Sequence, residues 1–175
     1  MRKLIWRLNS LYDLLPYSLM ALLARVVAGL VFFRSGLTKI DPEAFGLRPA
    51  TFFLFEQEYK VRILKYLGLS AGEFPFPAPH ALAYAATTVE LLMPLALWFG
   101  LGTRFAATVL LLQTCVIETV YPDSYMEHAL WAIALLMLMR FGPGLLSIDQ
   151  VVARLRGAIS SGKTHNSTPL QIFPS

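Results

Sequence analysis

Ionisable residues inside apolar stretches are the first sign of chemistry in this chain. Glu90 stands in the middle of the apolar stretch 81–100, and other apolar stretches hold Arg25, Arg34 and Glu118. A charged side chain near the centre of a bilayer costs about 2.5–3.5 kcal/mol on insertion scales, so it needs an opposite charge, a proton or a polar cavity. The pattern therefore predicts a membrane protein with a buried polar interior, and places its function there.

The predicted ion-pair partner of Glu90 is Arg34, with Glu118 as a second acceptor for the same guanidinium. If each apolar stretch is a helix with a rise of about 1.5 Å per residue, Arg34 and Glu90 differ in depth by only about 6 Å. A bidentate arginine–carboxylate pair is a favourable way to hold both charges in lipid. Two interpretations stay open: a structural ion pair that fixes the helix register, and a proton-coupled site.

In the second interpretation, a small redox-active or acidic ligand lies between a carboxylate and an imidazole. The predicted proton relay consists of Glu90, Glu118 and His128. The residues predicted to bind the ligand are Arg34, Lys39, Tyr84, Glu90 and Tyr121. All of them fall in the outer half of the membrane when depth is counted along the helices. The prediction is one pocket in that half.

Metal and nucleic-acid chemistry find little support. A haem held by His80 and His128 is geometrically conceivable, but histidines at helix starts are more often interfacial groups, and no metal site is predicted. The single cysteine, Cys115, excludes an internal disulfide and a multi-cysteine cluster. The basic residues are scattered and form no basic stripe, so nucleic acid is not an expected partner.

Composition and hydropathy predict an all-α fold, a bundle of four transmembrane helices. Hydrophobic residues make up 56% of the 175 residues and charged residues 15%, against about a quarter in soluble domains. The predicted spans are 16–40, 80–100, 103–121 and 124–141. The last must start near Ser124, because His128 to Arg140 alone would cover only about 18 Å of a core about 30 Å thick.

The segments outside the spans complete a single domain over residues 1–156. Aromatic residues recur at spacings of three and four between Phe52 and Tyr66, which predicts an outer interfacial helical segment between the first two spans. That segment packs as a lid on the bundle, binds a periplasmic or membrane protein or peptide, or acts as a gate for quinone. Residues 147–156 predict a short amphipathic helix, and 157–175 a flexible tail. The distribution of arginine and lysine places both termini in the cytoplasm.

Several short motifs in order along the chain resemble the DoxX family. They are Arg25-Val-Val-Ala-Gly29, Phe33-Arg-Ser-Gly-Leu-Thr-Lys39, Val89-Glu90, Gly100-Leu-Gly-Thr-Arg104, Gly142-Pro-Gly144 and Ser147-Ile-Asp149. The resemblance implies a four-helix protein of the bacterial inner membrane with a loose link to redox work. Some relatives are the membrane subunit of a thiosulfate:quinone oxidoreductase, others join complexes that resist oxidative stress, and distant eukaryotic ones act as cargo receptors.

By the same resemblance, Arg25, Lys39, Glu90 and Arg104 match recurrent positions of the family. The segment Phe53-Leu-Phe-Glu-Gln-Glu-Tyr59 is similar to a bacterial subgroup encoded beside enzymes that make modified, metal-binding peptides. The chain departs from the oxidoreductase members because it shows no fused soluble redox domain and no cysteine pair, so thiosulfate oxidation by this chain alone is not expected.

Three functional hypotheses follow. The first is a redox-associated membrane subunit that binds a quinone-like or small acidic ligand in the outer-half pocket and is not catalytic alone. The second is a non-enzymatic accessory protein for the maturation, export or anchoring of a secreted metal-binding peptide, reached through Phe52–Tyr66. The third is a haem-binding membrane protein. Quinone is the cofactor of the first hypothesis and haem that of the third.

Overall fold

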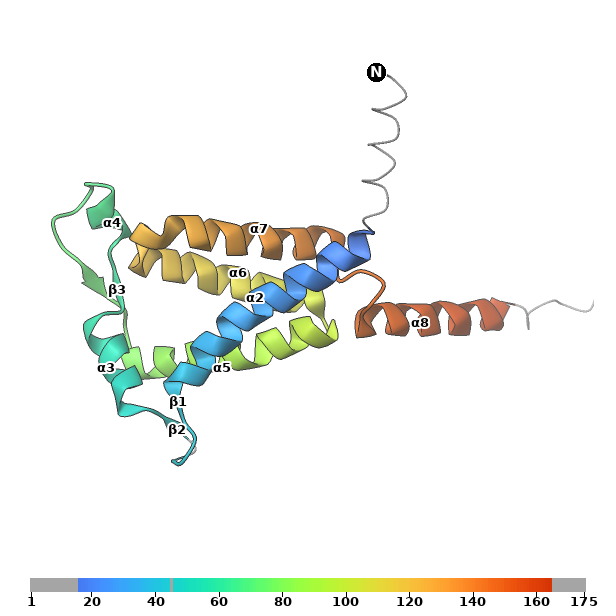
Figure 1. Cartoon of the computed structure of the whole chain (residues 1–175), viewed down its shortest axis with the longest axis horizontal. Coiled ribbons are helices and arrows are strands. Elements are labelled where there is room, and N and C mark those ends of the chain that lie inside the picture. The colour runs from blue at the N-terminus through green and yellow to red at the C-terminus, as the bar shows by residue number, and fades with distance from the viewer. Residues whose placement is uncertain (1–15, 45, 165–175) are drawn as a thin grey trace, which may run out of the picture.

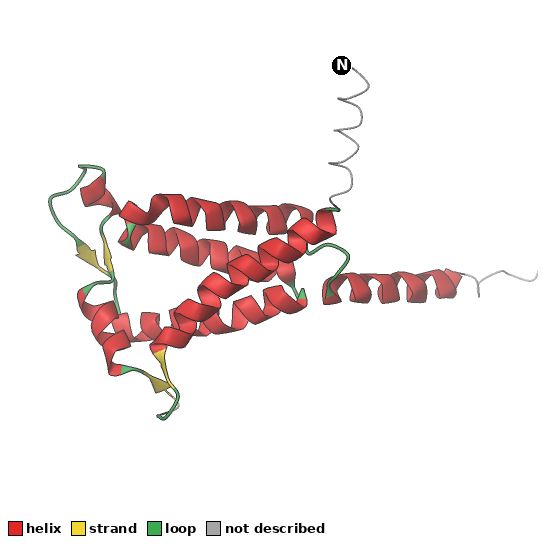
Figure 2. Ribbon diagram, viewed as in Figure 1, coloured by secondary structure: helices red, strands yellow, loops and turns green. Residues whose placement is uncertain are grey.

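A bundle of long helices makes up most of the molecule, and the blue helix near the N-terminus crosses the others obliquely (Figure 1). A computed structural model describes residues 16–44 and 46–164. The bundle helices are α2 (Tyr17–Lys39), α5 (Pro79–Phe99), α6 (Thr103–Val120) and α7 (Tyr125–Phe141). The first and last residues of each helix lie within one residue of the boundaries of a predicted span. Figure 2 shows that helices dominate the chain, which confirms the largely helical class.

Three of these helices, α2, α5 and α6, are long and apolar enough to cross a membrane. Large apolar side chains on the outside of the bundle are exposed, among them Leu23, Leu112 and Leu130. Such a surface suits lipid rather than water. The apolar helices therefore place the chain in a lipid bilayer. The 17-residue α7 packs along α6 and α2 in the same bundle.

The helices end where the sequence supplies glycine or proline. Gly100 and Gly102 have φ angles of +67° and +57° and make the tight turn between α5 and α6. Pro122 begins the one-turn helix η1 (Pro122–Ser124), which separates α6 from α7. Ser124 precedes α7 as expected, but its side chain makes no capping hydrogen bond.

Close contact between α2 and α5 depends on two glycines of α2. A Cβ atom added at Gly36 would lie 2.9 Å from Leu91 Cδ2 and 3.1 Å from Glu90 Cβ, and one at Gly29 would overlap the Trp98 ring. Small residues of this kind let two membrane helices approach closely. The register of α2 on α5 follows from these contacts, and it sets the position of Glu90.

The segment between α2 and α5 folds over one end of the bundle, and we call residues 46–75 the lid. It contains α3 (Pro49–Gln57), α4 (Ile63–Tyr66) and strands β2 (Gly46–Leu47), β3 (Lys60–Val61) and β4 (Phe74–Pro75). Strand β2 pairs with β1 (Ile40–Asp41), and β3 pairs with β4, both antiparallel. Phe55 and Tyr59 are buried against the bundle. The predicted helical segment is present and packs on the bundle, whereas these two-residue strands were not predicted.

At the opposite end, α8 (Ile148–Thr164) extends away from the bundle (Figure 1). The sequence predicted a short helix over 147–156 and a flexible tail from residue 157. The helix instead continues to Thr164, so the predicted boundary was wrong. The rest of the predicted tail, 165–175, and the basic residues of 1–15 lie outside the described residues.

Candidate functional site

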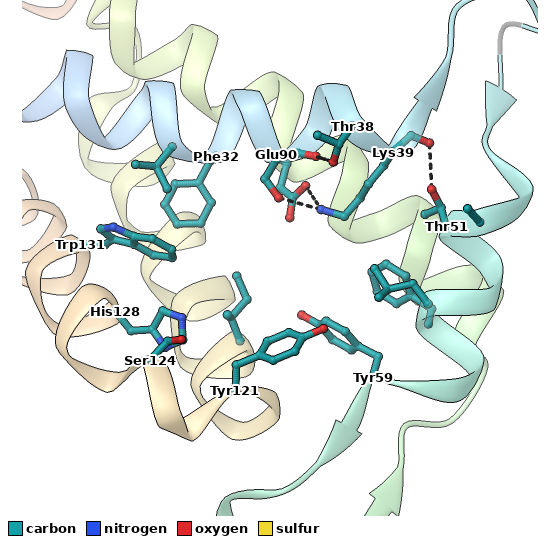
Figure 3. A pocket seen from close by; sticks show the side chains of 16 residues that line it. Phe32, Thr38, Lys39, Thr51, Tyr59, Glu90, Tyr121, Ser124, His128 and Trp131 are labelled. Carbon is teal, nitrogen blue, oxygen red and sulfur yellow. Dashed lines mark hydrogen bonds and ion pairs between the residues drawn. The ribbon is translucent and has the colours of Figure 1, made fainter.

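A cavity of about 480 Å³ lies under the lid, between α2, α3 and the start of α7 (Figure 3). Its polar lining includes Lys39, Glu90, Tyr59, Tyr121 and His128. Phe32 and Trp131 form an aromatic wall, with ring centroids 5.7 Å apart. Both the volume and the few polar groups in an apolar wall are typical of small-molecule sites, which span about 300–1,000 Å³.

The central contact of the cavity is an ion pair between Lys39 and Glu90. Their side chains are 12% and 4% exposed. One carboxylate oxygen of Glu90 accepts a hydrogen bond from Lys39 Nζ, and the other accepts one from Gln113 Nε2 at 2.9 Å. Lys39 Nζ also donates to Ser35 Oγ at 2.9 Å. An ammonium group has three N–H donors. Among the described residues only two are used, so one remains for a ligand.

The predicted pair between Arg34 and Glu90 was wrong. Arg34 is exposed, and no ion pair between described residues includes it. Arg34 and Lys39 are five residues apart, which places them about 140° from each other around α2. The depth estimate favoured Arg34 over Lys39, but the side of α2 that is turned to the cavity decides the partner. Phe32, Ser35 and Lys39, spaced three and four residues apart, lie on that side, and this spacing was a signal in the sequence.

A second polar pair joins α6 and α7 beside the cavity. His128 Nδ1 lies 2.5 Å from Glu118 Oε2, and the His128 side chain is almost fully buried. A carboxylate accepts hydrogen bonds, so Nδ1 is the donor of this contact. The structure therefore brings these two predicted relay residues together. His128 lines the cavity, and Glu118 holds the imidazole from behind.

Two tyrosine hydroxyls complete the donor set. The rings of Tyr59, in the lid, and Tyr121, at the end of α6, are 6.3 Å apart. Burial raises the pKa of Tyr59 well above its ordinary value, and the nearby charge of Glu90 raises it further. Both hydroxyls stay protonated near neutral pH. Neither forms a hydrogen bond with a described residue, so both can donate to a ligand.

Tyr84, which was predicted to bind the ligand, does not line this cavity. Its side chain is 54% exposed on α5, and its ring packs 5.6 Å from that of Phe52. Other residues that line the cavity were not predicted as ligand-binding residues: Tyr59, Phe32, Trp131, Ser35 and Thr51. Thr51 Oγ1 donates to the Lys39 carbonyl at 3.0 Å and so ties the lid to α2.

Two histidines lie in the described part of the chain, His80 and His128, and each contacts a carboxylate. Exposed His80 Nε2 lies 2.6 Å from Glu56 Oε1, and His128 contacts Glu118. Within residues 16–44 and 46–164, no group of three or more His, Cys, Asp and Glu side chains could hold a metal ion. Haem ligation by the two histidines stays a prediction, which an absorption scan for a Soret band tests.

Arg25 holds the other end of the bundle together. It is 2% exposed, and its guanidinium donates to the carbonyl oxygens of Leu97, Trp98, Pro143 and Leu146 at 2.7–2.9 Å. Asp149 supports the same region, because its carboxylate accepts the amides of Gly102 and Thr103 at 2.7 and 2.9 Å. The α5–α6 turn and the α7–α8 turn are thereby locked to α2.

A comparison with known families now bears on these residues. The DoxX family model matches residues 20–122, which is more than half of the chain. The chain belongs to the DoxX family. The DoxX match runs from α2 to the end of α6 and includes Arg25, Lys39, Glu90 and Gln113, while His128 and Trp131 lie beyond it. No curated protein and no solved structure matches the chain. Family membership and the apolar helices together indicate a membrane protein.

Proposed function

We propose that this DoxX protein is a redox-associated subunit of the bacterial inner membrane, and that the cavity under its lid binds a quinone-like ligand. In this proposal α7 is the fourth membrane span, both termini are cytoplasmic, and the lid faces the periplasm. The observation that carries the proposal is the set of unused hydrogen-bond donors around one cavity: the third N–H of Lys39 and the hydroxyls of Tyr59 and Tyr121.

The chemistry of this donor set favours a ring with carbonyl oxygens. A quinone presents two carbonyl acceptors at opposite edges of a flat apolar ring. Figure 3 shows Lys39 and Glu90 on one side of the cavity, with His128 on another and Tyr59 and Tyr121 below. Phe32 and Trp131 offer aromatic surface to the ring. Donors at the edges and aromatic walls at the faces suit such a ligand.

The charges around the cavity favour a neutral quinone over the alternative, a small acidic ligand. The ammonium of Lys39 is already neutralised by Glu90, and Glu118 adds a second carboxylate behind His128. An anion would therefore meet a lysine whose charge Glu90 already balances, with the Glu118 carboxylate close by. A neutral ligand with acceptor oxygens avoids that repulsion. We therefore favour a quinone over an acid.

Reduction of a quinone to a quinol takes up two electrons and two protons. Two groups at the cavity can transfer protons to the quinone oxygens. One is His128, which is hydrogen-bonded to Glu118, and the other is the Lys39–Glu90 pair. We assign the electrons to a partner redox protein, so the subunit is not catalytic alone. A quinol hydroxyl can donate to Nε2 of neutral His128, whereas a quinone carbonyl accepts from the lysine and tyrosine donors.

Quantification of bound quinone tests the proposal. Protein purified with its lipids is extracted with organic solvent, and quinone per protein is measured. We expect bound quinone in the native protein and a several-fold loss in the double variant Lys39→Met/Glu90→Leu. The matched control is Arg34→Gln, an exposed cation of the same helix. Absence of quinone from the native protein, together with no binding of added short-chain quinone, would refute the proposal.

A second candidate function rests on the outer surface of the lid. While Phe55 and Tyr59 face the bundle, Phe53, Tyr66, Leu69 and Phe74 are each at least half exposed. A non-enzymatic accessory role, with a secreted metal-binding peptide docked there, is the alternative proposal. A photo-crosslinker at Tyr66 tests it in cells, with one at buried Tyr59 as the control. Labelling of a secreted peptide from Tyr66 alone supports the role, and no labelled peptide from Tyr66 removes it.

A further inference from the structure

A second cavity, also of about 480 Å³, lies at the α8 end of the bundle. It sits between the start of α2, the start of α6 and the turn from α7 to α8, and Tyr17, Arg104, Phe105, Phe141 and Asp149 are in its lining. We propose that this cavity binds the phosphate group of an anionic phospholipid. The inference is independent of what binds under the lid.

The cation of this site is Arg104. Its side chain is exposed. Its guanidinium lies against Gly142, another lining residue, because Nε and Nη2 are each 3.7 Å from the position that a Cβ atom on Gly142 would occupy. No ion pair between the described residues includes Arg104. The one carboxylate in the lining, Asp149, has each oxygen occupied by a backbone amide. A planar guanidinium that is not committed to a carboxylate is well suited to bind phosphate oxygens.

The backbone adds to the positive potential at the same place. The cavity opens at the N-terminal end of the 18-residue α6, where first-turn amides lack intrahelical acceptors and the helix dipole favours an anion. Asp149 accepts the amides of Gly102 and Thr103 and so offsets part of this potential, which leaves Arg104 as the main cation of the site. Arg140 adds a further cation near the rim, because its guanidinium carbon lies 5.6 Å from the centre of the Phe141 ring.

The rim of the cavity explains why the phosphate belongs to a lipid. Phe105 and Phe141, which line it, are 68% and 61% exposed, and Leu101 and Leu145 nearby are also largely exposed. Water-soluble phosphates would leave this apolar surface uncovered, whereas the acyl chains of a phospholipid would cover it. A basic pocket between helix ends at the membrane surface is the arrangement that binds anionic headgroups.

Native mass spectrometry of the purified full chain tests the inference. The protein is released from detergent micelles after incubation with equal amounts of phosphatidylglycerol and phosphatidylcholine, and the lipids that remain bound are counted. We expect the native protein to retain phosphatidylglycerol in preference. Arg104→Gln should reduce that retention about tenfold, as expected for losing one charged hydrogen-bonding group. Arg154→Gln, an exposed arginine on α8 away from the cavity, is the matched control and should retain the lipid fully.

Two further arms separate the outcomes. Arg104→Lys keeps the cation and should retain the lipid better than Arg104→Gln; it also replaces that variant if Arg104→Gln fails to fold. Inorganic phosphate at millimolar concentration should not displace phosphatidylglycerol. Equal retention of the two lipids by the native protein would overturn the inference, as would equal retention by Arg104→Gln. Displacement by inorganic phosphate would show a site for a soluble phosphate and would overturn the lipid assignment.

Discussion

The two ends of this bundle bury a cation in opposite ways. Arg25, at the α8 end, gives its hydrogen bonds to four backbone carbonyls in two separate turns. Lys39, at the lid end, gives its bonds to the side chains of Glu90 and Ser35 at the wall of a cavity. The first cation is surrounded by acceptors that cannot leave without moving the backbone. The second keeps one donor for a molecule that enters the cavity.

The partners of a buried cation distinguish a structural charge from a functional one in an apolar bundle. Both cations lie on α2, both are buried, and both look alike in the sequence. Their partners differ: backbone carbonyls hold Arg25, while side chains beside open space hold Lys39. For that reason we assign a structural role to Arg25 and a ligand-binding role to Lys39. Variants at each end of the bundle test this assignment.

The largest effect is expected for Arg25→Met. Methionine fills part of the volume but leaves the carbonyls of Leu97, Trp98, Pro143 and Leu146 without a donor. Bonds to charged groups contribute about 1.5–3 kcal/mol each, so the loss should exceed about 5 kcal/mol. Unfolding by SDS titration, followed by circular dichroism, measures it. Native-like stability of this variant would contradict a structural role for Arg25.

A smaller loss of stability is expected at the lid end, where the single and the double variant should differ in their free energy of unfolding. Lys39→Met alone leaves the Glu90 carboxylate buried without its cation, and should cost about 3 kcal/mol. The double variant Lys39→Met/Glu90→Leu removes both charges and should recover most of that stability, because apolar replacement of a buried pair is often neutral. The same titration measures both. A double variant as unstable as the single one would mean that this pair holds the fold as Arg25 does.

Gly36→Ala tests whether the α2–α5 contact positions the ion pair. The added Cβ would lie 2.9 Å from Leu91 Cδ2 and 3.1 Å from Glu90 Cβ, so the helices must separate slightly. Overpacking of this kind costs about 1–3 kcal/mol. We expect weaker ligand binding along with lower stability. The control is Ala134→Gly on α7, a stability change away from the pair; if it weakens binding equally, Gly36 has no special role.

The smallest effect is expected for an exposed ion pair in the lid. The hydrogen bond from Lys65 at 3.2 Å lowers the pKa of Glu73 below its ordinary value, and Arg62 adds to this. A carboxyl whose pKa is lowered by folding stabilises the protein above its unfolded pKa, and this contribution is lost as pH falls through the folded value. Glu73→Gln should therefore flatten the acid side of the stability–pH profile only slightly. A large change at pH 7 would show that the lid depends on exposed charges.

The bundle was predictable because its boundaries are marked in the sequence. Each apolar stretch is bounded by glycine or proline, such as Gly100 and Pro122, and periodicity marked the lid helices. The β1–β2 and β3–β4 pairs were not predictable, since each strand has two residues and depends on the packing of the lid. The length of α8 was missed because glycine and serine after Arg156 suggested a tail.

The candidate site was predictable as a group of residues in one half of the bundle, but not as a set of pairs. Counting residues placed Lys39, Glu90, Tyr121 and His128 in the same half of the membrane, although it put Lys39 further from Glu90 than Arg34, and the structure brings all four to one cavity. The partner of Glu90 depends on which side of α2 is turned to the cavity, which counting cannot supply. Gln113 was a missed signal, because an amide in an apolar stretch needs a polar partner. Phe32 and Trp131 look like ordinary core residues until the cavity beside them is seen.

We propose above that a quinone-like molecule binds under the lid, beside the Lys39–Glu90 pair. Trp131 lines that cavity, and quinones quench tryptophan fluorescence at short range. The direct test is a titration of a protein with Trp6→Phe and Trp98→Phe, in which Trp131 alone reports, with decylubiquinone. We predict saturable quenching that is retained with Arg34→Gln and lost with Lys39→Met/Glu90→Leu. Quenching that rises linearly without saturation, and equally in all three proteins, would contradict the claim.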